Sequence, residues 1–222
     1  MYDIGNLTLI GSSHISPKSV KEVREVILEK QPNFVAIELD KGRFLGLMGK
    51  QSKLQFSQIR RMGVKGFLFA LFGSWLEEKL GKIVKTKPGA EMKSAVITAA
   101  KVNAKIALID QNIDITVKRL FKAITWREKF RFIGDIIKGL ISRKPQIDIK
   151  FDLREVPSEE IIEQMISLIK DRYPSVYKVL IDERNKYMAK KLQILMKQNP
   201  DAKIVVVVGA GHIKGMKEIL EH

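Results

Sequence analysis

The alternation of short apolar segments with helix-like segments is the feature that most constrains how this chain folds. Four segments are short, mostly apolar and end at or just before Gly or Asp: residues 7–10, 33–40, 105–110 and 203–209. Helical patterns follow them, and the first helix is predicted to begin at Ser16 and Pro17, a capping residue followed by a proline in the first turn. Buried strands that alternate with helices are typical of an α/β fold with a largely parallel central sheet and flanking helices.

Two regions interrupt this alternation and are predicted to be amphipathic basic helices inserted between sheet units. Residues 54–87 contain an aromatic cluster flanked by lysines, and residues 125–150 have apolar residues at helical spacing with Arg and Lys between them. Such helices could cover the active face, form the interface of a homodimer or lie against a membrane. Without a Ser/Gly-rich linker, residues 1–222 are predicted to form a single domain, and residues 221–222 resemble the junction to a polyhistidine tag.

The composition limits the kinds of partner and site. Lysine and arginine number 40 against 25 acidic residues, a formal net charge of +15, which suits nucleic acid, anionic lipid or an acidic partner, although Lys-rich surfaces are also common in heat-adapted proteins. No RNA-binding or zinc-knuckle motif accompanies the charge, so no nucleic-acid partner is expected. Since the chain has no cysteine, any metal site must use His, Asp, Glu, backbone or water.

Two of the three histidines lie in the same sequence frame at opposite ends of the chain. His14 and His212 each follow an apolar run, a glycine and two small residues. Ligands of parallel α/β sheets bind beyond the carboxyl ends of the strands, and neutral imidazole serves both as a metal ligand and as a general base. A single histidine at a strand end usually has a structural role, but the repeated frame in a chain this poor in histidine favours a shared functional site.

Several charged side chains are candidates for the same edge of the sheet. Glu38, Arg43 and Asp110 follow two of the predicted strands. Four further candidates lie in predicted helices: Glu91, Arg119, Glu183 and Arg184. Each of these four also has a simpler interpretation, because a glutamate at a helix start stabilises the helix dipole and charges on a helix surface form solvated ion pairs.

Six motifs occur in an order that resembles the TraB/PrgY family, within the wider TraB–TIKI–GumN superfamily. They are GSSHIS (11–16), AIELDKGR (36–43), GAEMKSA (89–95), LIDQNIDITVKR (108–119), DERNKYMAKKL (182–192) and VVGAGHIKGM (207–216). The resemblance covers almost the whole chain and lies in the combination of motifs. It implies a fold similar to the erythromycin-esterase/ChaN group, with two related halves that face one cleft and each donate one histidine.

The same resemblance implies a chemistry for these residues. The TIKI branch resembles a peptidase that depends on a divalent metal, so His14, Glu91 and His212 are expected to bind manganese, cobalt or zinc, which activates a water for attack on a peptide bond. Glu38 or Glu183 is then the expected general base. Three arginines are expected to steady carboxylates or the developing oxyanion: Arg43, Arg119 and Arg184.

Two alternatives remain open from the sequence. The cleft could hold a peptide or another ligand without cleaving it, as the PrgY branch limits the activity of a peptide pheromone, or the basic helices could make the protein a membrane-surface adaptor. Family members often carry transmembrane helices after this domain, so the full-length protein is expected to be membrane-associated, with the basic domain on the cytoplasmic face. The chain departs from the common family pattern at Ser12, Ser13 and Gln111, which bears on substrate preference.

Overall fold

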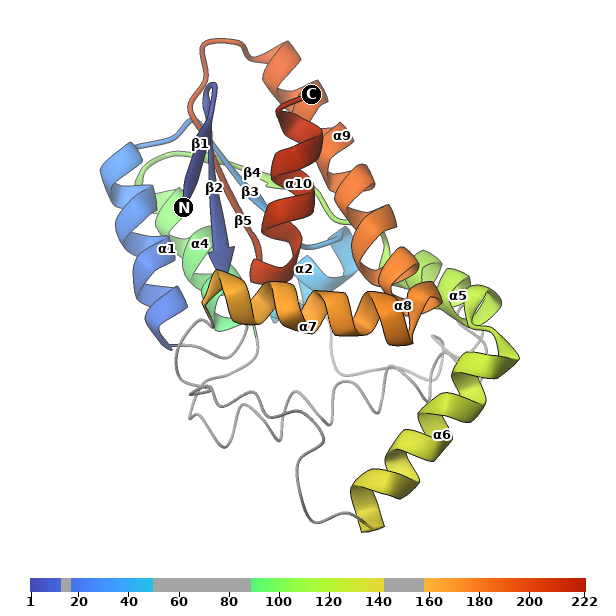
Figure 1. Cartoon of the computed structure of the whole chain (residues 1–222). Helices are drawn as coiled ribbons and strands as arrows, with labels where there is room; N and C mark the ends of the chain where they lie inside the picture. Colours follow the sequence, from blue (N-terminus) through green and yellow to red (C-terminus); the bar gives the residue numbers. More distant parts are fainter. Residues whose placement is uncertain (13–16, 50–88, 142–157) are drawn as a thin grey trace.

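The computed structural model describes residues 1–12, 17–49, 89–141 and 158–222. Its centre is a five-stranded mixed sheet in the order β1–β2–β5–β3–β4 (Figure 1). The strands are β1 (Tyr2–Ile4), β2 (Leu7–Ser12), β3 (Phe34–Ile37), β4 (Lys105–Leu108) and β5 (Ile204–Gly209). The predicted insertion at 54–87, the part of the second insertion at 142–150, and His14 lie outside the described residues.

Four of the five strands are parallel, which confirms the α/β fold with a largely parallel sheet. β2, β5, β3 and β4 pair in parallel, and Ser12 lies opposite Gly209 at the ends of β2 and β5. β1 pairs antiparallel with β2 at the edge of the sheet. The sequence does not predict this edge strand, because it has only 3 residues, with Asp3 in the middle, and shows no apolar run.

Helices connect these strands and cover the sheet. Before β5 they are α1 (Pro17–Lys30), α2 (Lys41–Leu47), α4 (Ala90–Lys101), α5 (Ile113–Ala123), α6 (Trp126–Ile141), α7 (Glu159–Arg172), α8 (Pro174–Tyr177) and α9 (Glu183–Gln198). A π-helical segment, η1 (Lys178–Asp182), joins α8 to α9, and a 3₁₀ turn, η2 (Ala210–His212), leads from β5 into α10 (Ile213–Leu220). The helix that contains Glu91, α4, begins at Ala90, directly after Gly89, whose φ of 77° suits glycine.

The helices divide the hydrophobic core into two layers, one on each face of the sheet. On one face α1 and α4 pack side by side, and Val23, Ile27 and Met92 are buried against the strands. On the other face α9 and α10 pack together through Leu192 and Met216. The side chains of β5 alternate between the two layers, with Val205 and Val207 in the first and Ile204, Val206 and Val208 in the second.

β2 and β5 lie side by side, but the helices that follow them cover opposite faces of the sheet. α1 follows β2 and packs with α4, whereas α10 follows β5 and packs with α9 (Figure 1). The two segments therefore separate beyond the carboxyl ends of these strands, which is where ligands bind in open α/β sheets. Gly11 fits the close approach before they separate, since a Cβ there would lie 2.8 Å from Cγ1 of Ile213.

α6 extends away from the sheet (Figure 1). Four of its apolar side chains follow one another at helical spacing and are exposed: Trp126, Phe130, Ile133 and Ile137. The predicted amphipathic helix in the second insertion is thus confirmed over Trp126–Ile141. Among the residues that the structure describes, no helix is long and apolar enough to cross a membrane.

Candidate functional site

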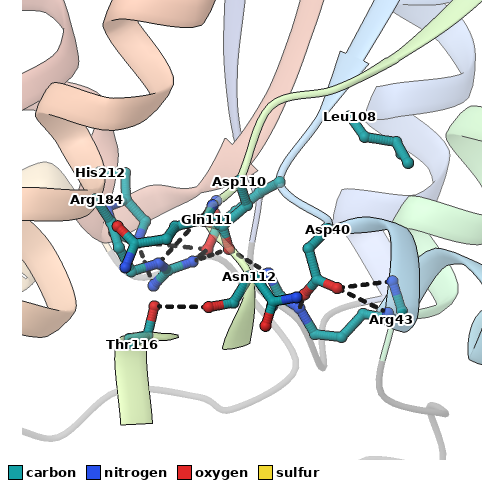
Figure 2. A network of polar contacts seen from close by, with 12 residues as sticks. Asp40, Arg43, Leu108, Asp110, Gln111, Asn112, Thr116, Arg184 and His212 are labelled. Atoms are coloured by element: carbon teal, nitrogen blue, oxygen red, sulfur yellow. Dashed lines mark hydrogen bonds and ion pairs between the residues drawn. The ribbon is translucent and has the colours of Figure 1, made fainter. Parts of the chain in front are cut away.

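The carboxyl edge of the parallel sheet gathers a buried cluster of charged side chains. Glu38 follows β3 directly, Asp110 follows β4, and His212 ends the 3₁₀ turn after β5. Arg184, in the first turn of α9, reaches this edge from the face that α9 covers. Figure 2 shows Arg184 beside His212, with Asp110 between Arg184 and the side chains of α2. Glu38, Asp110 and His212 are all buried, so the cluster is largely shielded from water.

The guanidinium of Arg184 is the centre of the cluster. Its Nε and Nη2 donate to the two carboxylate oxygens of Asp110, at 3.1 and 2.7 Å, and Nη2 also pairs with Oε1 of Glu38. Two-point pairing of this kind fixes both groups in orientation. Burial alone would lower the pKa of Arg184, but the charges of Glu38 and Asp110 outweigh it and raise that pKa above its ordinary value. Arg184 is therefore a permanent cation at this point.

The contacts of His212 determine which ring nitrogen carries the hydrogen. Nε2 lies 3.1 Å from Nη1 of Arg184, and Nδ1 lies 2.6 Å from Oδ1 of Asn185. Because a guanidinium can only donate hydrogen bonds, Nε2 is the acceptor, and the hydrogen on Nδ1 is donated to Asn185. The lone pair of Nε2 is thus directed at the centre of the cluster, where Oε1 of Glu38 lies 3.4 Å away.

The carboxylates also bind the backbone and a second arginine. Oε2 of Glu38 accepts a hydrogen bond of 2.6 Å from the backbone N–H of Gly209, which ties β3 to the end of β5. Asp40 caps α2 by accepting from the N–H of Gly42 at 2.7 Å, and its other oxygen accepts from Nε of Arg43 at 2.7 Å. Arg43 in turn pairs with Asp110. The cluster thus spans three strand ends.

The local sequence explains how Arg184 and Asn185 reach the site. Both lie in the first turn of α9, just after the π-helical segment and Glu183, and π-helical turns inside helices often occur at functional sites. The carbonyl of Leu180 in this segment accepts a hydrogen bond of 3.1 Å from Nη1 of Arg184. Gly215 of α10 provides the room for Asn185, because a Cβ at position 215 would clash with Nδ2 of Asn185.

The structure brings together five of the residues predicted from the sequence. Hydrogen bonds and ion pairs connect them in one cluster: Glu38, Arg43, Asp110, Arg184 and His212. Arg119 and Glu183 form an ion pair with each other, with distances of 2.9 and 2.8 Å, in which Arg119 is mostly exposed. Glu91 is fully buried in the first turn of α4. His14 lies outside the described residues, so its place in the site stays a prediction.

The described residues do not fit a metal ion in this arrangement. Both ring nitrogens of His212 are engaged, and the guanidinium of Arg184 takes the position on which Glu38, Asp110 and His212 converge. Over residues 1–12, 17–49, 89–141 and 158–222, no three acidic or histidine side chains are disposed to hold a metal. A metal at this point requires Arg184 to move away, and the ligand set of His14, Glu91 and His212 stays a prediction.

Two residues have roles in the cluster that the sequence does not predict. Asn185 orients His212, and Asp40 holds Arg43 while capping α2. Asn185 carries a signal in the sequence, because an asparagine inside a helix competes for backbone hydrogen bonds and usually occurs there for a reason. Asp40 ends the second apolar segment, two residues after Glu38, so its place at this edge of the sheet is predicted, whereas its contact with Arg43 is not.

Comparison with known proteins places the whole chain in one group. A sequence model of the TraB/PrgY/gumN family matches residues 3–222. An uncharacterised protein of Methanocaldococcus jannaschii is 34% identical over 219 residues, which cover 97% of this chain and 53% of that protein. The TraB domain-containing proteins of Homo sapiens and Mus musculus are each 25% identical over 245 residues, 97% of this chain and 63% of theirs. The chain therefore spans less than two thirds of the length of these relatives.

Proposed function

The chain belongs to the TraB/PrgY/gumN family, and on this premise we propose that it is a hydrolase that cleaves peptide bonds at the centre formed by Glu38, Arg184 and His212. The observation that carries the proposal is the distance of 3.1 Å between Nε2 of His212 and Nη1 of Arg184. It puts a nitrogen with a lone pair next to a permanent cation at the carboxyl edge of the sheet. Hydrolysis of an amide needs these two elements, a proton acceptor and a stabiliser of negative charge.

Each residue has a role that follows from its contacts. The substrate carbonyl takes the hydrogen bond that Nη1 of Arg184 makes to His212, and the guanidinium then stabilises the oxyanion that forms. Nε2 of His212, released from Arg184, accepts the proton of the attacking water and passes it to the leaving amine. Such an acid–base group accelerates a reaction by roughly 10²–10⁴-fold, and one oxyanion donor by about 10²–10³-fold.

Glu38 and Asp110 are positioning residues in this proposal. They hold the guanidinium from two sides, so that only Nη1 exchanges its partner when the substrate binds. Asn185 keeps the hydrogen of His212 on Nδ1. The divalent ion that the family resemblance implies, manganese, cobalt or zinc, remains a separate prediction, and no step above depends on it.

A second function has one specific observation in its favour. Both nitrogens of His212 have hydrogen-bond partners, and the charges of Arg184 are matched by Glu38 and Asp110. A cluster that is satisfied in this way also suits a domain that holds a peptide without cleaving it. Membrane association, a cytoplasmic position and a homodimer stay predictions in either case.

Incubation of the tag-free protein with a mixture of peptides, followed by mass spectrometry, tests the two functions. The reactions are run with EDTA and with added manganese, cobalt or zinc, and the metal content of the protein is measured in parallel. The hydrolase proposal expects several cleavages per protein molecule, lost in His212→Ala and Arg184→Lys variants that remain folded. Stoichiometric capture of intact peptides, unchanged by either substitution, supports the binding function instead.

The predicted histidine pair is tested in the same preparations. His14→Ala and His212→Ala should each remove both cleavage and any bound divalent ion, if the two histidines share one site. Cleavage that survives His14→Ala separates the described centre from the predicted pair.

A further inference from the structure

A groove with a volume of about 640 Å³ lies next to the cluster, and its lining includes Asn185, the partner of Nδ1 of His212. Its walls come from α1, α7 and α10, and its floor contains Gly11 of β2 with Ala210 and Gly211 of η2. α7 runs across the carboxyl ends of the strands at this side of the molecule (Figure 1). A volume of this size is within the range of roughly 300–1,000 Å³ that is typical of ligand sites.

The groove lies where the fold favours a ligand. β2 and β5 are neighbours in the sheet, and their following helices α1 and α10 leave toward opposite faces. Residues from both exits line the groove, among them Lys18 of α1 and Lys214 of α10. A crevice between two such strand ends is the general place for ligands in open α/β sheets. The groove therefore coincides with the point where the fold favours a ligand.

Two glycines that line the groove, Gly11 and Gly211, place no side chain in it. A Cβ at Gly211 would lie 3.7 Å from Cδ1 of Ile166 in α7, which is van der Waals contact, so any larger side chain there would enter the space under α7. Gly11 is in close contact with Ile213. Small residues at these positions let a bound chain approach the backbone at the start of η2.

Part of the groove lining is aliphatic. It contains four isoleucines: Ile162, Ile166, Ile181 and Ile213. The rings of Tyr2 and Tyr177 also contribute to the lining, and the hydroxyl of Tyr2 donates to Glu159 at 2.7 Å. These aliphatic side chains favour apolar ligand groups, because a polar group placed against them would lose its hydrogen bonds to water. Ser167 and Asn185 add polar groups to the same lining.

The rim of the groove carries charges of both signs. Four acids and three lysines line it: Glu22, Glu159, Glu163, Glu218, Lys18, Lys170 and Lys214. Lys214 pairs with Glu163 at 2.7 Å, and the nearby carboxylates raise the pKa of Lys214. The chain as a whole has 40 basic and 25 acidic residues, so the groove does not share its positive excess. An acidic ligand would bind elsewhere on such a protein, whereas a neutral or basic peptide suits this rim.

We propose that this groove binds a peptide through a bulky aliphatic side chain, Leu, Ile or Val, held between α7 and α10. That the ligand is a peptide rests on the proposed function, whereas the preference for an aliphatic group rests on the lining itself. Asn185 lines the groove and also binds Nδ1 of His212, so only Asn185 separates the bound side chain from the proposed catalytic histidine. The groove then decides which residue of a peptide is presented near the cluster.

The test measures binding and needs no catalysis. Two capped hexapeptides, Ac-Gly-Ser-Leu-Gly-Ser-Gly-NH2 and the same sequence with Ser in place of Leu, are titrated to millimolar concentration with EDTA present. Backbone amide NMR signals report the position of binding, and mass spectrometry checks that the peptides stay intact. The leucine peptide should shift the signals of Gly11, Ile166 and Gly211, and the serine peptide should leave them unchanged.

Two tryptophan variants on the same helix provide a matched comparison. Ile166→Trp fills the groove and should weaken binding of the leucine peptide by about tenfold or more, since one buried aliphatic side chain contributes at least that much. Leu168→Trp, at a side chain that is 47% exposed and outside the groove, should bind like the wild type. If Ile166→Trp does not fold, Gly211→Val blocks the groove from its floor.

Equal binding of the two peptides, shifts away from the groove, or no effect of blocking it would overturn the proposal. The outcome is separable from that of the proposed function. Leucine-dependent binding, together with no cleavage in the peptide mixture, supports the groove and refutes the hydrolase proposal. Cleavage that is the same in the wild type and in Ile166→Trp supports the hydrolase proposal and refutes the groove.

Discussion

His212 and Asn185 are joined by a hydrogen bond of 2.6 Å between Nδ1 of the ring and Oδ1 of the amide, and both side chains are buried. This bond is made on one side of the ring, while Arg184 contacts the other side through Nε2. Asn185 follows Arg184 in the chain, so one turn of α9 holds the histidine from both edges. The ring therefore has a single orientation and a single tautomer.

Asn185→Ala should release His212 from the Nδ1–H tautomer. Without the amide oxygen, the ring hydrogen has no fixed acceptor, and we expect a mixture of tautomers together with a loss of cleavage of at least about tenfold. Long-range ¹H–¹⁵N NMR measures the tautomer directly, and assignment is simple because the chain has only 3 histidines. Asn185→Asp, which keeps an acceptor oxygen, should retain the Nδ1–H signal. A wild-type tautomer in the alanine variant would contradict the assigned role.

Gly215→Ala should disturb the hydrogen bond between His212 and Asn185 while leaving both of these residues in place. The new Cβ would clash with the amide nitrogen of Asn185, so the side chain must shift, at a cost of roughly 1–3 kcal/mol in the free energy of unfolding. Gly134→Ala is the matched control, because it also lies in a helix but its Cβ would meet nothing within 4 Å. It should be neutral or stabilise by up to about 1 kcal/mol.

Denaturant unfolding of both glycine variants checks this prediction, with the NMR signals of His212 as a second readout. The tautomer signal should change in Gly215→Ala and stay the same in Gly134→Ala. Two variants of equal stability would mean that Asn185 has room to move and does not fix the histidine.

The sheet could be predicted from the sequence because its strands are continuously apolar. The run from Ile204 to Val208 is buried on both faces, so it has no polar alternation and is visible as a segment. The strand order could not be predicted, since it depends on which face each crossover helix covers. The start of α7 is indicated by the sequence, because Ser158 caps the helix and glutamates occupy its first turn. Its position across the strand ends depends on tertiary packing and could not be predicted.

The site could be predicted in part, for a physical reason. Residues that follow parallel strands are brought to one edge, which is why Glu38, Asp110 and His212 meet. Residues on helices are not constrained in this way: Arg184 joins the cluster, while its neighbour Glu183 turns to Arg119 instead. The sequence predicts that Arg184 steadies carboxylates in the site, but not that its guanidinium takes the central position, because ligand types and spacing suit a metal there equally well.

The link between α6 and α8 should depend on pH through Glu128. Its carboxylate accepts from the backbone N–H of Thr125 at 2.8 Å and of Ser175 at 2.7 Å. Burial raises the pKa of Glu128, but these donors outweigh it, so the pKa lies below the ordinary value of 4.5. A lowered pKa means that the carboxylate stabilises the fold above about pH 4.5 and loses this contribution as the pH falls through the lowered pKa.

Glu128→Gln should therefore unfold more easily than the wild type at pH 7, by roughly 1–3 kcal/mol. This difference in the free energy of unfolding between the wild type and the variant should stay constant down to about pH 5. It should become smaller below the ordinary pKa of the carboxyl group. Urea unfolding at a series of pH values measures it, with Glu29→Gln, an exposed residue of α1, as the control. A gap that widens on acidification would show that the charge of Glu128 does not stabilise the folded state.

Arg184→Ala should convert the centre of the cluster into a site for a divalent cation. The substitution leaves the buried carboxylates of Glu38 and Asp110 without their shared partner and frees Nε2 of His212, which costs about 3–5 kcal/mol of stability. Two carboxylates and one imidazole suit manganese, cobalt or zinc, so an added ion should restore part of this loss. Each metal should then raise the Tm of the variant by about 5 °C or more, which thermal unfolding with and without the metal measures.

The comparison that decides this prediction is with Arg119→Ala and the wild type. Arg119 is also paired with a carboxylate, but that pair is separate from the cluster and its arginine is mostly exposed, so the variant should lose at most about 1 kcal/mol and gain no metal response. If Arg184→Ala responds to metals no more than Arg119→Ala, the cluster does not act as a cation site. If the wild type is the one most stabilised by metal, the ion binds while Arg184 is present, and the ligand set predicted from the two histidine motifs becomes the better account of this family's chemistry.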